Sequence, residues 1–229
     1  EGKDKKDNEL TLDQVLEAFY KAVGGKKNWE NVDTMLMRGA RCAGSNRVQV
    51  KAYNMKPNKC RADFSLKENE IIQSFDGKTG WTQSTLSKDK APRIMSEWKA
   101  RYLDDTCDIG GPLINYKNRG AELAFLGKGD LYGKQVYKIQ ATYQSGNSQV
   151  YYLDEKTFLP VRMDGDYLFA ADEVTRITTT FSNYKSVGDF IMPHTLEFHT
   201  EGKDQTERLT FSTILFNVKL DEKIFSLPE

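Results

Sequence analysis

Alternation of apolar and polar side chains with a period of two runs through most of this chain, and it limits the fold more than any other feature of the sequence. Turn-forming groups such as Gly44-Ser45-Asn46 and Asp76-Gly77 divide the alternation into short segments. We predict strands at residues 33–42, 47–55, 60–66, 70–76, 79–84, 121–128, 134–143, 149–153, 158–163, 173–184, 190–199 and 206–216. About a dozen antiparallel strands in succession indicate a mostly β protein of the α+β class, built on a single long curved sheet.

The third predicted strand separates its side chains onto two faces. Cys60, Ala62 and Phe64 lie on one face, whereas Arg61 and Asp63 lie on the other. This pattern predicts a sheet with one apolar face and one face in contact with water.

A helix is predicted at residues 12–23, ahead of the first strand. Thr11 and Gln14 match the T-x-x-Q capping box, which marks the start of a helix. Apolar residues then recur at helical spacing until Gly24-Gly25, where the glycines permit the left-handed conformation that ends a helix.

Residues 87–119 interrupt the strand pattern with helical features, so we predict a helical insert there. Pro92 suits the first position of a helix, and residues 111–117 suggest a second short helix. The apolar stripe of the first piece comprises Ile94, Met95, Trp98 and Tyr102. Both pieces must bury their apolar faces, and the concave side of the curved sheet is the available surface.

The composition excludes several classes of partner. Lys plus Arg number 33 and Asp plus Glu number 33, so the formal net charge is zero and there is no basic surplus for nucleic acid. No apolar run approaches the ~18 residues that a membrane-spanning helix needs. Residues 1–9 lack apolar side chains, and we expect them to form a mobile charged tail ahead of a single domain at residues 10–229.

The residues that carry chemistry do not form a recognisable catalytic motif. Cys42, Cys60 and Cys107 allow at most one internal disulfide, and their spacing leaves the pairing open. No G-x-S-x-G sequence, phosphate-binding loop or complete calcium loop occurs. A Cys107 and His194 dyad and the acidic pair Asp172-Glu173 are minor alternatives, each implying a hydrolase. We therefore expect a protein without enzymatic activity, metal or cofactor.

Four segments also match a known family in their order and spacing. They are residues 11–16 with 22–25, residues 76–81, residues 151–162 and residues 220–228, with a further match at 181–194. The second of these reads Asp76-Gly77-Lys78-Thr79-Gly80-Trp81. Through these segments the chain resembles the LolA-like family of periplasmic, outer-membrane lipoprotein-sorting proteins from Leu10 to Pro228.

The resemblance implies an unclosed β-barrel of about eleven antiparallel strands, with helices at its mouth and a hydrophobic cavity for lipid acyl chains. The pieces at 91–103 and 111–117 would form a lid over this cavity. The resemblance also implies a periplasmic location, either soluble or tethered by an N-terminal lipid anchor, after removal of any signal peptide. We expect a monomer whose partners are a lipid, a lipidated protein or another envelope protein.

The aromatic share of 11% provides large side chains for such a cavity, and the alternating strands and the insert supply the candidates to line it. The predicted ligand-binding residues are Leu36, Val50, Phe64, Ile72, Trp81, Ile94, Met95, Trp98, Tyr102, Leu113, Ile114, Tyr137, Ile139, Tyr151, Leu153, Val161 and Met163. The same periodicity also fits a filled core, as in a structural or interaction module of an envelope assembly that has only protein partners. Such a module, without a ligand-binding cavity, is the alternative function.

Overall fold

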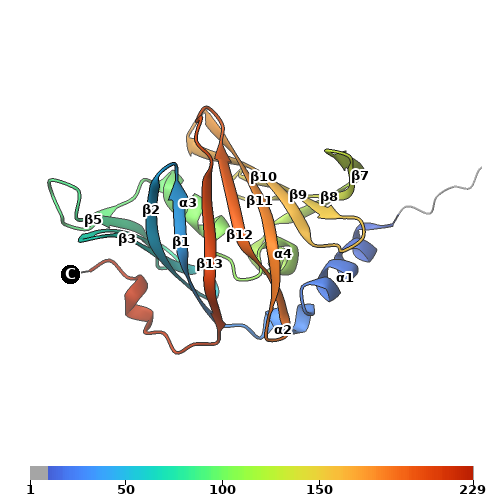
Figure 1. The fold of residues 1–229 in the computed structure, drawn as a ribbon, viewed down its shortest axis with the longest axis horizontal. Coiled ribbons are helices and arrows are strands. Elements are labelled where there is room, and N and C mark those ends of the chain that lie inside the picture. The colour runs from blue at the N-terminus through green and yellow to red at the C-terminus, as the bar shows by residue number, and fades with distance from the viewer. Residues whose placement is uncertain (1–9, 229) are drawn as a thin grey trace, which may run out of the picture.

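The computed structural model describes residues 10–228, and one sheet of 13 antiparallel strands forms its framework. The strands are β1 (Thr34–Ala43), β2 (Asn46–Met55), β3 (Lys59–Leu66), β4 (Asn69–Phe75), β5 (Gly80–Ser84), β6 (Arg93–Ile94), β7 (Glu122–Leu131), β8 (Lys134–Thr142), β9 (Ser148–Asp154), β10 (Pro160–Ala170), β11 (Glu173–Val187), β12 (Phe190–Thr200) and β13 (Glu207–Phe216). Two meanders, β1 to β6 and β7 to β13, join where β1 pairs with β13 (Figure 1). Because β6 and β7 lie at opposite edges of the sheet, the curved sheet is an unclosed barrel.

All the predicted strands are present, which confirms the mostly β, single-sheet fold. The sheet also contains β6, which was not predicted, and its 13 strands exceed the number that the resemblance implies. The predicted tail at residues 1–9 lies outside the described residues.

Helix α1 (Leu12–Ala22) confirms the predicted capping box. The backbone N–H of Thr11 donates to Gln14 Oε1 at 2.9 Å, and the N–H of Gln14 donates to Thr11 Oγ1 at 3.3 Å. The apolar side of α1, including the fully buried Val15, packs into the main core cluster together with Trp29 of the short helix α2 (Lys26–Glu30). Each large apolar side chain buried in this way contributes about 1.5–3 kcal/mol, so α1 is a fixed part of the core.

Helix α3 (Glu97–Thr106) begins later than predicted. Its N-cap is Ser96, whose hydroxyl accepts from the N–H of Lys99, whereas Pro92, which was predicted for the first helical position, lies ahead of the helix. Upstream of it the chain is extended, because Ile94 pairs with Trp81 across the β5–β6 ladder. Ile94 therefore does not form a helical stripe with Tyr102, and 67% of its surface is exposed, contrary to the predicted lid packing.

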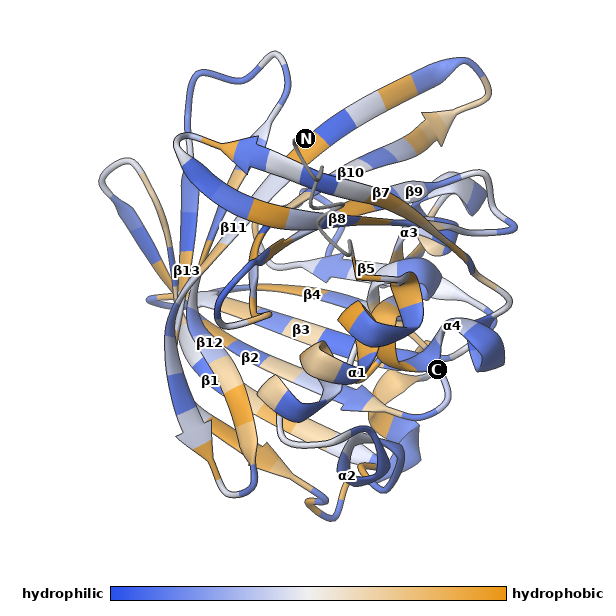
Figure 2. Ribbon diagram, turned by 90° about the vertical axis from the view of Figure 1, so that its right-hand side faces the viewer, coloured by the Kyte–Doolittle hydropathy of each residue, from blue (hydrophilic) through white to orange (hydrophobic). Residues whose placement is uncertain are grey.

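Helix α4 (Pro112–Arg119) forms where the second short helix was predicted. Pro112 occupies its first turn, and Gly120 ends it in the left-handed region at a φ of 64°. In Figure 2 the curved sheet surrounds α1, α3 and α4, so these helices lie on its concave side. No helix within residues 10–228 combines the length and the apolar character needed to cross a membrane.

The convex face of β3 to β5 is covered by the end of the chain, so the predicted water-facing side is wrong for this part of the sheet. After β13, the chain forms a short 3-10 helix, η1 (Glu222–Phe225), beside β3. Phe225 is fully buried, and its carbonyl oxygen accepts from Trp81 Nε1 at 2.7 Å and from Ser74 Oγ at 2.9 Å. Arg61 donates to the carbonyl oxygen of Ile224 at 3.0 Å. We refer to residues 217–228 as the C-terminal strap.

Candidate ligand-binding groove

Four cavities lie along the concave side of the sheet, against α3 and the segment that joins α3 to α4. Cavity A has a volume of about 240 Å³, and its lining includes Phe19, Trp29, Leu113, Tyr184 and Met192. Cavity B, of about 200 Å³, includes Tyr102, Asp108, Gln149, Tyr167 and Phe198. Cavity C, of about 420 Å³, includes Val50, Ala62, Phe64, Leu196 and Phe211. Cavity D, of about 460 Å³, includes Thr82, Met95, Lys99 and Phe169.

Neighbouring cavities share their walls. Tyr151 and Phe181 line both cavity A and cavity B, whereas Leu196 and Phe198 line both cavity B and cavity C. Tyr102 lines cavities B, C and D. The four cavities therefore follow one another as one interrupted groove, with side chains forming the partitions.

Tyr102 of α3 is the central partition of this groove. Its ring centroid lies 4.8 Å from that of Tyr167, edge to face, and 5.4 Å from that of Phe169. Burial raises the pKa of the Tyr102 hydroxyl above its usual value. Because both aromatic partners lie on β10, Tyr102 attaches the middle of α3 to the second meander.

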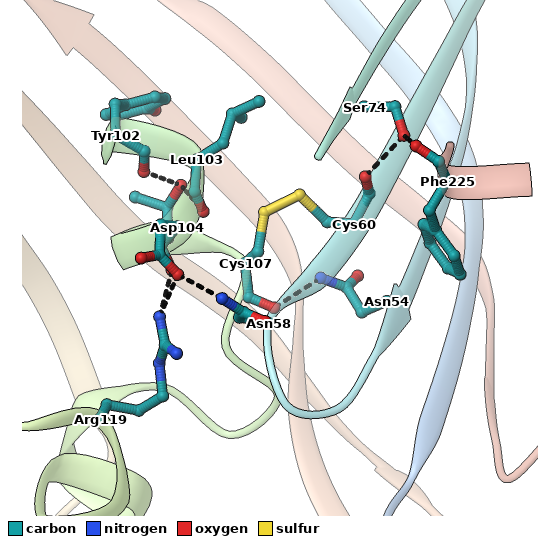
Figure 3. The surroundings of a disulfide bond; sticks show 11 residues. Asn54, Asn58, Cys60, Ser74, Tyr102, Leu103, Asp104, Cys107, Arg119 and Phe225 are labelled. Carbon is teal, nitrogen blue, oxygen red and sulfur yellow. Dashed lines mark hydrogen bonds and ion pairs between the residues drawn. A yellow bond between two sulfur atoms is a disulfide. The ribbon is translucent and has the colours of Figure 1, made fainter. Parts of the chain in front are cut away.

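The C-terminal end of α3 is attached to the first meander by a disulfide between Cys60 of β3 and Cys107 (Figure 3). The carbonyl oxygen of Cys107 accepts from Asn54 Nδ2 at 3.0 Å. Asp104 accepts from Asn58 Nδ2 at 2.7 Å and forms an ion pair with Arg119. Figure 3 shows these contacts gathered at one end of the helix.

The disulfide also shows which two of the three cysteines pair, a question that their spacing in the sequence leaves open. Cys42 is the free cysteine, and Cys60 and Cys107 form the one internal disulfide that three cysteines allow. Because the Cys107 sulfur is covalently bonded to Cys60, it is not available as the thiol of a Cys107 and His194 dyad.

Polar groups are buried beside cavity B, whose lining includes both Asp105 and Asp108. Asp105 accepts from Asn147 Nδ2 at 2.6 Å and from Ser145 Oγ at 2.5 Å. Burial raises the pKa of Asp105, while these hydrogen bonds lower it. Burial also raises the pKa of Asp108, to about 7, although Asn115 donates a hydrogen bond to its carboxylate at 3.0 Å.

Many of the predicted ligand-binding residues line this groove. Those in cavity walls are Val50, Phe64, Ile94, Met95, Tyr102, Leu113, Ile114, Tyr151 and Met163. Three others, Tyr137, Ile139 and Leu153, belong to the closed core cluster against α1. Trp98 and Val161 line none of cavities A to D; Trp98 lies beneath the Arg101 guanidinium, and Val161 lies at a bulge in β10.

Leu36, Ile72 and Trp81 lie on the opposite, convex face. Directly paired residues share a face of a sheet, and Trp81 pairs with Ser74, which contacts the C-terminal strap. Ile72 lies two residues from Ser74 on the same strand, and Leu36 reaches the same row through β2 and β3. These residues therefore face away from the groove, and Trp81 holds the strap through its hydrogen bond to Phe225.

The sequence prediction missed the wall that β11 to β13 contribute. Phe181, Leu196 and Phe198 line the cavities, and Leu196 pairs directly with both Phe181 and Leu209. The alternation of Leu196 and Phe198 along their strand is a readable signal for a shared face.

Comparison with solved structures identifies other proteins that share this architecture. A protein of the DUF1329 family from Desulfovibrio piger superposes with a TM-score of 0.61 at 12% identity, covering 92% of this chain and 97% of that one. A protein from Vibrio parahaemolyticus, described as an outer membrane lipoprotein-sorting protein domain, gives 0.61 at 14% identity, over 94% of this chain and 97% of its own. A LolA superfamily protein from Nitrosomonas europaea gives 0.61 at 11% identity, over 95% and 98%.

The chain has the LolA-like fold. No protein-family model and no curated protein sequence matches it. At 11–14% identity the likeness concerns the LolA-like fold alone, and it confirms the half-barrel expected from the resemblance.

Proposed function

We propose that the protein is a non-enzymatic periplasmic carrier that binds the acyl chains of a lipid or a lipidated protein in the concave groove. The observation that carries the proposal is the succession of cavities A to D, whose shared walls consist largely of aromatic and aliphatic side chains. Each methylene that moves from water into such a groove contributes ~0.8 kcal/mol. A chain of about a dozen methylenes would therefore be held tightly but reversibly.

The LolA-like fold supports this proposal, since one similar structure is described as a lipoprotein-sorting domain. In this proposal residues 10–229 act as one monomeric unit, either soluble in the periplasm or tethered by an N-terminal lipid anchor. The candidate binding residues are those that line the cavities, among them Val50, Phe64 and Tyr151.

Helix α3 has the attachments expected of a lid that opens at one end. The disulfide at Cys107 holds its C-terminal end. Ahead of its other end, the pairing of β6 is limited to Trp81 with Ile94 and Thr82 with Arg93, plus one hydrogen bond from the N–H of Met95 to the carbonyl oxygen of Gly80 at 2.8 Å. In this proposal a ligand enters beside cavity D, next to the short strand β6.

Native mass spectrometry of protein purified gently from its own host tests the proposal, together with uptake of a fluorescent fatty acid by delipidated protein. We expect a copurifying lipid mass and saturable uptake. The variant Ala62→Trp places an indole in cavity C and should reduce uptake at least tenfold. The matched control is Val174→Trp, at a position with 59% of its surface exposed, which should leave uptake unchanged.

An apo mass without lipid, together with no uptake of the fatty acid, would contradict the carrier function. That result would favour the alternative, an envelope interaction module with protein partners only. Equal loss of uptake in Ala62→Trp and Val174→Trp would also count against a site in the groove.

A further inference from the structure

Cavity C has charged side chains at the end farthest from the disulfide. Cys60, Ala62 and Phe64 follow one another on the same face of β3, and all three line the cavity. The Arg41 guanidinium lies over the Phe64 ring, 5.5 Å from its centroid, and forms an ion pair with Glu207. The cavity therefore runs from the disulfide along apolar side chains to a charged end.

Arg41 keeps free hydrogen-bond donors at this end. Within residues 10–228 its side chain donates to Glu207 alone, and 36% of the side chain is exposed. A guanidinium has more N–H donors than one carboxylate can use, and its planar fork matches the oxygens of a carboxylate or a phosphate. Arg41 can therefore bind a second anion beside Glu207.

Lys203 adds another positive charge at the same end. It lies in the turn between Thr200 and Glu207, and all three residues line cavity C. Lys203 forms no ion pair with a residue that the structure describes. Glu207 is the only acidic residue in the lining, since Glu201 and Asp204 of the same turn are not part of it. The side chains at this end of the cavity therefore carry more positive than negative charge.

Tyr102 supplies a further unused donor. Its side chain lines cavity C, and its hydroxyl has no hydrogen-bond partner in the described part of the chain. Burial raises the pKa of this hydroxyl, Arg41 lowers it and Glu207 raises it, so the hydroxyl lies within electrostatic reach of the ion pair. Polar groups removed from bulk water are almost always paired, so an unpaired hydroxyl in a cavity wall indicates that a ligand or a water molecule is its partner.

Resting on the carrier function proposed above, we propose that cavity C binds amphiphiles that carry an anionic headgroup, a carboxylate or a phosphate. The apolar chain lies along side chains such as Ala62 and Phe64, and the headgroup lies against Arg41. Such headgroups accept hydrogen bonds from Arg41 and Tyr102, and Lys203 adds electrostatic attraction. An uncharged headgroup gains only ordinary hydrogen bonds there, which are about half as strong as those to an ion.

Probes that share one chain length and differ in the headgroup test this inference on the full chain. Decanoate, decyl phosphate and 1-decanol are each used at pH 8 to displace N-phenyl-1-naphthylamine, an uncharged fluorescent probe, from delipidated protein. We expect both anions to bind about tenfold more tightly than the alcohol. Inorganic phosphate should not displace the probe at the same concentrations, because it lacks the apolar chain.

Substitutions at the charged end assign the preference to its residues. Arg41→Gln should reduce it to less than about threefold, and so should Arg41→Gln combined with Glu207→Gln, in which no unpaired carboxylate remains. Tyr102→Phe keeps the ring and should reduce the preference by about twofold to fivefold. Arg38→Gln is the matched control, because Arg38 alternates with Met37 on β1 and faces the convex side, so it should leave the preference unchanged.

Three results would overturn the inference. Equal binding of decanoate, decyl phosphate and 1-decanol by the unaltered protein would leave cavity C a site for apolar chains alone. A preference for the anions that persists when both Arg41 and Glu207 are replaced would place the headgroup elsewhere. Displacement by inorganic phosphate as effective as that by decyl phosphate would indicate a site for small anions. If no amphiphile displaces the probe and a fluorescent fatty acid does not bind either, the carrier function itself fails.

Discussion

Cys107 at the end of α3 is covalently bonded to Cys60 on β3, although 47 residues separate the two cysteines in the chain. The bond joins the helix that partitions the groove to the strand that forms one of its walls. Both cysteines line cavity C, so this constraint acts on the candidate site itself.

Removal of the disulfide should loosen α3 as well as destabilise the fold. A crosslink across a loop of this length constrains the unfolded chain, and Cys60→Ala with Cys107→Ala should lower the free energy of unfolding by about 2–4 kcal/mol in urea titrations. Amide hydrogen exchange should become faster in α3 than in β8. Cys42→Ser, at the free cysteine, is the control and should change the unfolding free energy by less than ~0.5 kcal/mol. Unchanged exchange in α3 would show that other contacts hold the helix.

Truncation of Tyr102 should join cavities B, C and D. Tyr102→Ala removes the ring between them, so we expect faster uptake of a fluorescent fatty acid and a loss of about 2–4 kcal/mol in stability. Trp98→Ala is the matched comparison on the same helix, because Trp98 lines none of these cavities. The idea of Tyr102 as the partition fails if both variants change the uptake rate equally.

The C-terminal strap should contribute substantially to stability through Phe225. Phe225→Ala removes a fully buried ring from the convex face and should lower the free energy of unfolding by about 3–5 kcal/mol. Leu227→Ala, in the same strap but at a residue with 38% of its surface exposed, should cost less than about 1 kcal/mol. Thermal or urea unfolding measures both. Similar losses for the two variants would argue that the strap acts as a whole and not through this ring.

Asp108 should make stability depend on pH. Burial raises its pKa from 3.8 to about 7 in the folded state, so between these values the folded protein binds more protons than the unfolded chain, and stability falls as pH rises. Asp108→Asn should therefore be more stable than the unaltered protein at pH 8, by about 1–3 kcal/mol, with the gain shrinking towards pH 4. Urea titrations across this range provide the measurement. A gain that is independent of pH would rule out this ionisation as its cause.

The sequence predicts the strands and α1 well because their signals are local. Thr11 and Gln14 lie three positions apart, and strand alternation is visible within a few residues. The start of α3 cannot be predicted from local signals, because Pro92 suits the first turn of a helix and an edge strand equally. The ladder between Trp81 and Ile94 decides between these two structures.

The candidate groove could be predicted only in part, because alternation shows which residues share a face but not which face is concave. Val50 and Phe64, neighbours across β2 and β3, were predicted to line a cavity, and both lie in the wall of cavity C. Leu36 faces away from the groove, since the wall contains Met35 and Met37 on either side of it. Burial of the convex face depends on the contact between Trp81 and Phe225, 144 residues apart, which no local pattern reveals.

The pairing of β1 with β13 has a consequence for how the protein is made. Met35 pairs with Phe216, so the centre of the sheet joins the two ends of the chain, while the free edges β6 and β7 come from its middle. Contacts between such distant positions are slow to form, because a long loop must close before they contribute any stability. During synthesis the two meanders can form separately, but the groove between them exists only after the last strand has been released. A chain that is stopped before β13 would therefore present two unjoined half-sheets with exposed edges, the form in which this fold is most prone to aggregate.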